Sequence, residues 1–288
     1  EIHSGDWSSD VCSSDLDRLE DINKPLNSSD FPLPETQWTR YFFGSDNTLS
    51  KTPSARQDGG DADTYEVAAD VADEELDGLD YRVAFDEPTA ICGPITVTLW
   101  ASSTTPDTDF FAVVSDVAPD GRVCPLQRGM LRASYRALDE EMSTWTDAQA
   151  EKVLIRPYHT LQNPQPLEPG KPYRFEIEVF PVGHVFRAGH KLSVSISQPP
   201  LNDPVPISKR KQGYQSGSYK YESKQPPGTV TIHRGGDYPS SVLLPLLPEL
   251  PPIREKLRES LDKLWRQPES EGVPAAGFHE PQDKGDPS

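Results

Sequence analysis

Hydrophobic and polar residues alternate along several short stretches of this chain, with the period of two that is typical of half-buried β-strands. The clearest stretch is GPITVTLWASS (93–103), in which Ile95, Val97 and Leu99 fall on one face and Trp100 falls on the other, after two threonines. Comparable alternating or apolar runs predict further strands at 109–117, 122–136, 173–180, 190–197, 229–233 and 241–247.

A turn signal joins two of these predicted strands. Residues 118–121 read Ala-Pro-Asp-Gly and lie between the apolar runs 109–117 and 122–136. Asp-Gly at such a place is typical of a tight hairpin, because the turn needs a residue that accepts positive φ. We therefore predict a β-hairpin that turns at Asp120 and Gly121.

The segments between the runs are less regular. Residues 44–64 are polar and predict a loop, although Trp38 and the aromatic run just before this segment indicate β-structure. Residues 65–80 are acidic and are interpreted as a loop or a short helical turn, and the polar stretch 137–152 is compatible with a helical turn. Residues 199–228 have no strong period, and a loop of that length is usually functional or mobile.

Proline supports an all-β fold. The chain has 30 Pro residues, which break helix interiors and favour short strands with irregular connections. The Pro-rich stretches 164–172 and 199–206 are interpreted as long connections between two sheets. The sequence therefore predicts an all-β sandwich.

The two ends of the chain lack the patterns of the middle. Ser-Ser-Asp occurs twice within residues 1–16, and WSSDVCSSDL resembles translated sequencing-adapter DNA. We expect these residues to lie outside the fold, rather than to be a disordered native tail, and expect the natural chain to extend upstream of Asp17. At the other end, the periodicity of 251–266 predicts a short C-terminal amphipathic helix docked on the sandwich, followed by a disordered tail at 267–288.

Charge and composition narrow the classes of partner that this chain is expected to bind. The formal net charge is -18, which opposes binding to nucleic acid or to an anionic membrane surface. No apolar run reaches the roughly 20 residues of a membrane span. No signal peptide is recognisable. The sequence does not determine the cellular compartment, and the cytoplasm is slightly favoured. Three Cys residues are too few for a disulfide scaffold, and Cys92 and Cys124 are interpreted as small buried side chains in strands.

Residues capable of nucleophilic catalysis are not evident. The G-x-S-x-G elbow of α/β-hydrolases is absent. The loop GYQSG (213–217) has one residue too many before Ser216, and we do not interpret it as a nucleophile site.

Metal ligands and acid–base pairs are not evident either. His184 and His190 flank a turn without obvious carboxylates, and we interpret them as hydrogen-bonded turn residues rather than metal ligands. Asp107 and Asp109 are interpreted as acceptors of backbone N–H bonds at the start of a strand. The sequence thus predicts no catalytic residue, no metal site and no cofactor.

Three segments nevertheless match one family in order and spacing. SSTTPDTDFFAVVSDVAPDGRV (102–123), LEPGKPYRFEIEVFPVGHVFRAGHKLSVSIS (167–197) and HRGGDYPSSVLLPLLP (233–248) resemble the C-terminal jelly-roll domain of cocaine-esterase-like and Xaa-Pro dipeptidyl-peptidase-like serine hydrolases. The resemblance covers about residues 31–248 and implies a galactose-binding-like jelly roll. The motif residues, which we interpret as structural, are Asp107, Asp109, Asp120, Gly121, Gly189, His190, His233, Pro239 and Ser240.

The resemblance implies a role next to an enzyme. In that family the Ser, Asp and His of the triad lie on an upstream α/β-hydrolase domain, and the β domain packs on it and walls its active site. None of the three can be placed here, so this chain by itself is expected to be inactive. The implied organisation is a remnant of the hydrolase domain and linker at 17–40 and the jelly roll at 41–250.

The sequence departs from the family pattern at 71–80, which reads VADEELDGLD instead of a P-V-P…G-G segment. A second hypothesis is a free-standing jelly-roll module that binds carbohydrate or a protein. Its aromatic platform would have to come from Trp100, Tyr214, Tyr219 and Tyr221. Homo-oligomerisation stays open.

Overall fold

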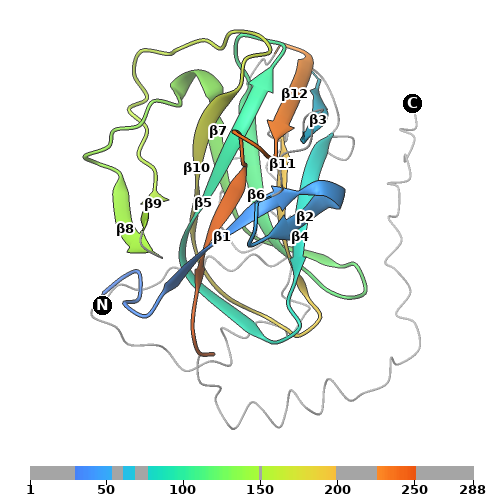
Figure 1. Ribbon diagram of the computed structural model, residues 1–288, viewed down its shortest axis with the longest axis vertical. Coiled ribbons are helices and arrows are strands. Elements are labelled where there is room, and N and C mark those ends of the chain that lie inside the picture. Colours follow the sequence, from blue (N-terminus) through green and yellow to red (C-terminus); the bar gives the residue numbers. More distant parts are fainter. Residues whose placement is uncertain (1–29, 54–60, 69–76, 149–150, 199–225, 251–288) are drawn as a thin grey trace, which may run out of the picture.

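The computed structural model describes residues 30–53, 61–68, 77–148, 151–198 and 226–250, and it is built almost entirely of strands (Figure 1). The helices within those ranges are two three-residue turns, η2 (Ser45–Asn47) and η4 (Ala133–Tyr135). The strands are β1 (Gln37–Gly44), β2 (Thr48–Ser50), β3 (Ala62–Val67), β4 (Gly78–Ala84), β5 (Thr89–Ser103), β6 (Asp109–Val117), β7 (Val123–Arg132), β8 (Thr144–Ala148), β9 (Glu151–Arg156), β10 (Tyr173–Phe186), β11 (Lys191–Ser197), β12 (Gly228–His233) and β13 (Ser241–Leu246).

The strands predicted from alternation are present, and the all-β sandwich is confirmed. β6 has the predicted bounds, whereas β5 begins earlier and β10 continues past residue 180 to Phe186. β1 begins at Gln37, inside the segment expected to be a linker.

The predictions for the irregular segments were wrong in two places and incomplete in a third. The expected loop 44–64 contains β2 and the start of β3, and the acidic stretch 65–80 contains the end of β3 and the start of β4. The polar stretch 137–152 contains one helical turn at 139–143, where the N–H of Ser143 donates to Asp139 O at 2.9 Å, but the rest of it forms β8 and the start of β9. These strands are short or largely exposed, so they carry little apolar alternation from which they could be recognised.

The strands form two layers, and β5 is the centre of the first layer. One edge of β5 pairs with β10 over its whole length, and its other edge is shared between β12 and β13. β3 extends this layer beside β12, and β1 extends it beside β13. The second layer has the order β4-β11-β6-β7. A single parallel pair, Thr48 with Arg82, joins β2 to β4 and so links the two layers.

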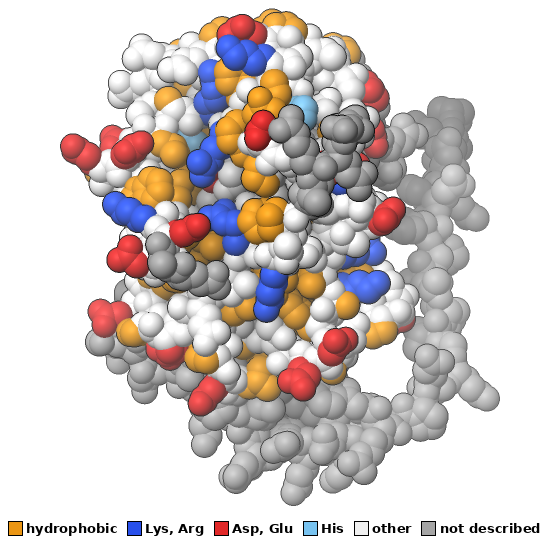
Figure 2. Space-filling view, in the orientation of Figure 1, with side chains coloured by type: hydrophobic (Ala, Val, Ile, Leu, Met, Phe, Trp, Pro, Cys, Tyr) orange, Lys and Arg blue, Asp and Glu red, His pale blue; other side chains and the backbone are white. Residues whose placement is uncertain are grey.

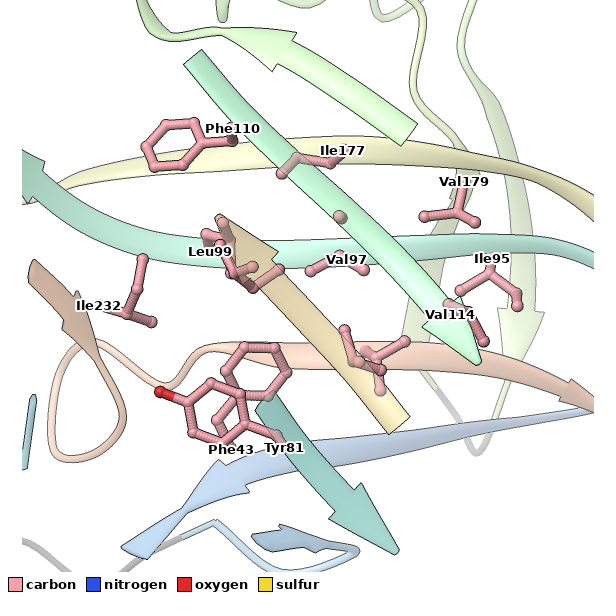
Figure 3. Packing of buried hydrophobic residues seen from close by; sticks show 14 of the residues in the cluster. Phe43, Tyr81, Ile95, Val97, Leu99, Phe110, Val114, Ile177, Val179 and Ile232 are labelled. Carbon is pink, nitrogen blue, oxygen red and sulfur yellow. The ribbon is translucent and has the colours of Figure 1, made fainter. Parts of the chain in front are cut away.

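Apolar side chains from the two layers meet in one core (Figure 3). The ring of Phe110 on β6 lies 4.7 Å from the ring of Phe175 on β10, centroid to centroid. Phe43 on β1 stacks on Tyr81 of β4 at 4.2 Å. Tyr81 keeps its hydroxyl satisfied by donating to Asp63 Oδ2 at 2.7 Å, as a buried phenol must.

The layers also approach each other at the β7–β10 edge. A Cβ at position 129 of β7 would lie 2.0 Å from the backbone oxygen of Glu178 on β10. Only glycine allows this approach, because any side chain would push the two backbones apart. Gly129 therefore closes the side of the sandwich where no backbone pairing joins β7 to β10.

Several predictions made from the sequence concern residues that the structure does not describe. The adapter-like segment 1–16, the helix at 251–266, the tail at 267–288 and most of the loop 199–228 lie outside the described residues. Neither of the two short helices in the described ranges has the length or the apolar character to cross a membrane.

Candidate functional site

The predicted hairpin turn is present between β6 and β7. The N–H of Gly121 donates to Ala118 O at 2.9 Å, and φ is +90° at Gly121. Asp120 accepts from the backbone N–H of Arg122 at 3.1 Å and from its Nε at 2.7 Å. These bonds, the backbone bond first, hold the pKa of Asp120 below its usual value. Both motif residues therefore shape an exposed turn.

The two aspartates before β6 have different partners. Asp107 Oδ1 accepts backbone N–H bonds from Ser134 at 2.8 Å and from Thr108 at 3.1 Å, as expected. Asp109 is buried and forms a bidentate pair with Arg132 on β7, with both distances 2.9 Å. This pair joins the cross-strand neighbours at one end of the β6–β7 ladder.

His184 and His190 are hydrogen-bonded, as expected, but their partner is a carboxylate that the sequence had not indicated near them. Asp116 Oδ1 lies 2.8 Å from His190 Nδ1, and Asp116 Oδ2 lies 2.8 Å from His184 Nε2. Gly189, with φ of +82°, makes the tight turn into β11 and donates its N–H to Phe85 O at 2.8 Å. One carboxylate thus holds the ends of β6, β10 and β11 together. In the sequence, Asp116 stands out as a charged residue in the apolar run of β6. Alternation alone, however, interprets it only as the end of the strand and does not indicate its histidine partners.

The motif at the start of β13 completes the hydrogen bonding of β5 at the point where β12 and β13 meet along its edge. Two strands share that edge, and their pairings end at Trp100 with His233 on β12 and at Thr98 with Ser241 on β13. Ser240, fully buried, lies at the gap and accepts the N–H of Trp100 on Oγ at 2.9 Å. Its own N–H donates to His233 O at 3.3 Å. Pro239 precedes it in the connection, where no ladder bond is required of its nitrogen.

His233 also contacts a serine. Its Nε2 lies 3.2 Å from Ser102 Oγ, and desolvation by burial lowers the pKa of His233 below its usual value. Nucleophilic catalysis would also need an acid that orients the imidazole, and a serine exposed at a turn. No described carboxylate hydrogen-bonds to His233, and Ser102 is buried within strand β5 rather than exposed at a turn.

The parts of a catalytic triad are therefore separated. The Ser–His contact lies near Ser102 at one end of β5, and the Asp–His contacts lie near Ile91, which pairs with His184, at the other end. Ser102 lies eleven positions after Ile91 along β5, which corresponds to roughly 30 Å or more. The described residues thus bring together no nucleophile, base and acid.

A polar cluster covers the outer face of the first layer. Thr98 on β5 donates to Glu176 Oε2 at 2.7 Å, and Arg174 Nε donates to Glu176 Oε1 at 2.6 Å. Arg40 on β1 donates to Ser241 Oγ at 3.1 Å. Desolvation by burial raises the pKa of Glu176 despite both arginines, and desolvation lowers the pKa of Arg40. Sequence reasoning missed this cluster, because its members come from four strands.

The hairpin of β8 and β9 covers the rest of that face. Val153 and Ile155 pack on Trp38 and Leu243, and Thr96 donates to Ile155 O at 3.0 Å. His159 Nε2 lies 2.8 Å from Glu176 O just beyond the hairpin. This arrangement fixes the hairpin against β1, β13 and β5.

Metal binding and thiol chemistry find little support in the described residues. Within those ranges, no group of three or more His, Cys, Asp or Glu side chains has a geometry that could hold a metal ion. Cys92 is a free thiol whose pKa is raised, chiefly by burial. Cys92 and Cys124 are both half-buried rather than fully buried, which corrects the prediction for these two residues.

The fold and these contacts define a β-sandwich whose motif residues hold turns and strand junctions. The model of the X-Pro dipeptidyl-peptidase C-terminal non-catalytic domain matches residues 12–243. This match covers most of the chain, and the chain belongs to that family.

Known relatives agree with the family. The cocaine esterase of Rhodococcus sp. (strain MB1 Bresler) is 28% identical over 263 residues, covering 78% of this chain and 40% of the esterase. A CocE/NonD family hydrolase from Staphylococcus aureus superposes with a TM-score of 0.64 at 22% identity, over 77% of this chain and 39% of that one. An aminopeptidase from a marine sediment archaeon, Thaumarchaeota archaeon, gives 0.56 at 18% identity, over 77% and 38%. The chain therefore spans about two fifths of the length of these relatives.

Proposed function

We propose that this chain is the accessory β domain of a serine hydrolase that acts on esters or on X-Pro peptides. The observation that carries this proposal is the family match, because it places the chain in a non-catalytic C-terminal domain. The relatives with named activities are an esterase and an aminopeptidase, and each is more than twice as long as the matched segment.

In this proposal the domain packs on an α/β-hydrolase domain of the same natural chain and forms one wall of its active site. The chemistry belongs to that domain, where an activated Ser attacks the acyl carbon and a His transfers the proton to the leaving group. The separation of Ser102–His233 from Asp116 supports a structural contribution from the β domain. Its rigid strands and buried junctions suit a wall that must hold its shape during turnover.

The alternative is a free-standing module that binds carbohydrate or a protein. One observation favours it: Trp100 and Tyr238 lie together near the surface, with ring centroids 5.1 Å apart. However, the rings are tilted by 54°, so they do not form the flat platform on which a sugar ring usually stacks. The other three candidates, Tyr214, Tyr219 and Tyr221, lie outside the described residues.

Activity assays test the proposal directly. The 288-residue chain should hydrolyse neither a chromogenic short-chain ester nor an X-Pro anilide, and should not react with a serine-directed phosphonate. Restoring the reading frame upstream of the codon for Asp17 should produce hydrolysis of the ester or of the X-Pro anilide, together with reaction with the phosphonate.

The Ser102→Ala and Ser216→Ala variants are the matched controls. Turnover by the 288-residue chain that either substitution removes, or phosphonate labelling at either serine, would overturn the accessory role. A restored frame that lacks a hydrolase domain would favour the free-standing module.

A further inference from the structure

Two Asp-Gly dipeptides lie at exposed positions among the described residues. They are Asp77-Gly78 at the start of β4 and Asp120-Gly121 in the turn between β6 and β7. Acidic side chains are scattered over the surface that Figure 2 shows, so exposure alone does not distinguish one aspartate from another. The hydrogen bonds around the two dipeptides do distinguish them.

At Asp77 the backbone nitrogen of the next residue is held against the side-chain carboxylate. The N–H of Gly78 donates to Asp77 Oδ1 at 2.9 Å, and the N–H of Glu66 donates to Asp77 Oδ2 at 2.8 Å. Because Oδ1 is bonded directly to Cγ, the first contact also places the Gly78 nitrogen close to Cγ. Two groups that are already held together react much faster than groups that must first be brought into contact.

At Asp120 the same two groups are engaged with other partners. The N–H of Gly121 donates to Ala118 O at 2.9 Å. The carboxylate of Asp120 accepts from the backbone N–H of Arg122 at 3.1 Å and from its Nε at 2.7 Å. These bonds also hold the pKa of Asp120 below its usual value, which favours the ionised carboxylate over the more electrophilic acid.

We propose that Asp77 is a site of spontaneous isoaspartate formation in the folded protein, and that the turn protects Asp120 from the same reaction. This inference does not rest on the proposed function. It concerns a covalent modification that follows from where the Gly78 nitrogen and the Asp77 carboxyl group stand.

The reaction has two steps. First, the Gly78 nitrogen bonds to Cγ of the protonated Asp77 side chain, and the carboxyl hydroxyl leaves with the proton of the nitrogen as one water, which closes a five-membered succinimide. Water then adds to the main-chain carbonyl carbon of Asp77 and breaks its bond to the Gly78 nitrogen. The main chain now runs through Cγ, and the net change is an isomerisation, because one water is lost and one is regained.

The packing of β4 requires the glycine that makes this ring closure easy. A Cβ at position 78 would lie 2.9 Å from the backbone oxygen of Ile196 on β11, so a side chain there would push the two strands apart. The same absence of a side chain leaves the Gly78 nitrogen unhindered when it attacks Cγ.

The modification would act on an edge of the sandwich. β3 is an edge strand, and Asp77 occupies one of its N–H groups, that of Glu66. An isoaspartyl residue adds a methylene to the main chain just before Gly78, which pairs with Ser197. The Glu66 N–H would lose its acceptor, and an unpaired strand edge is a site where another chain can pair.

Peptide mapping of aged protein tests this inference. The 288-residue chain is incubated at neutral pH and physiological temperature, and isoaspartyl residues are located by electron-based fragmentation in a mass spectrometer. Digestion after Glu, Lys and Arg places Asp77 in residues 76–82 and Asp120 in residues 83–122. Both are thus separated from the third Asp-Gly, at 58–59, which lies outside the described residues. The isoaspartyl fraction at Asp77 should exceed that at Asp120 several-fold.

Incubation of the unfolded chain is the matched control. In concentrated urea the two aspartates should form isoaspartate at similar rates, because each is followed by glycine and neither keeps its folded contacts. A difference of the same size in urea would assign it to the local sequence and overturn the inference. Equal fractions in the folded protein, or more isoaspartate at Asp120, would also overturn it.

A substitution checks the assignment of the signal. Asp77→Glu keeps the negative charge, but ring closure would then need a six-membered imide, which forms much more slowly. The isoaspartyl signal in residues 76–82 should disappear in this variant while the fraction at Asp120 stays the same. A signal that persists in residues 76–82 would belong to Asp80 and would contradict the role of Asp77.

Discussion

The two faces of β5 are almost equally buried, but by different chemistry. Its inward residues, such as Val97 and Leu99, are 0% exposed and lie among the apolar side chains of the other layer (Figure 3). Its outward residues Thr96 and Thr98 are only 2% and 6% exposed, and each donates a hydrogen bond to a specific acceptor.

The difference separates two contributions to the structure. Apolar burial on the inward face is non-directional and supplies most of the stabilisation. The outward hydroxyls lose water on burial and must be paired, so they fix the β8–β9 hairpin and Glu176 at defined positions. The inward face thus stabilises the sandwich, and the outward face sets where its surface groups stand.

Truncation on the inward face should have the largest effect. Leu99→Ala removes a fully buried side chain between the layers, and such changes cost about 2–5 kcal/mol because a cavity remains. The free energy of unfolding from urea denaturation measures this loss. Thr98→Ala, one position away on the outward face, is the matched control and should cost less; an equal loss would remove the distinction between the faces.

Alternation along the chain predicted the inward face well, because Ile95, Val97 and Leu99 need no knowledge of their partners to be recognised as core. The outward face could not be derived in the same way. The position of Glu176 depends on Thr98, which lies 78 residues away in the sequence.

Among the motif residues, too, local roles could be predicted from the sequence and roles that depend on distant partners could not. Asp120 and Gly121 were recognisable, since a hairpin turn is local chemistry. Asp116 was not, because its two histidine partners lie 68 and 74 residues away. The role of Ser240 likewise depends on how β12 and β13 share one edge of β5.

Truncation on the outward face should have a smaller effect that depends on pH. Glu176→Ala leaves the buried Thr98 hydroxyl without its acceptor and should cost about 1–3 kcal/mol. Glu178→Ala, on the same face of β10, removes an ion pair with the half-exposed Arg156 and should cost less than about 1 kcal/mol.

The pH dependence follows from the raised pKa of Glu176. The folded protein keeps this proton at pH values where the unfolded chain, near its ordinary value of 4.5, has lost it. Wild type should therefore gain stability relative to Glu176→Ala as the pH falls from 7 toward 4.5. Urea midpoints of both proteins at several pH values measure this, and a difference that is constant or shrinks on acidification would contradict the assignment.

An effect smaller than those of Leu99→Ala and Glu176→Ala is expected at a position that touches neither face. Gly121 has φ of +90°, and a Cβ added there would meet nothing within 4 Å. Gly121→Val should therefore cost roughly 1–2 kcal/mol from backbone strain alone. Gly121→Asn should cost less, because Asn tolerates positive φ far better than a β-branched residue. Denaturation midpoints compare the two variants; equal losses would mean that side-chain contacts, not the turn conformation, set the energy of this hairpin.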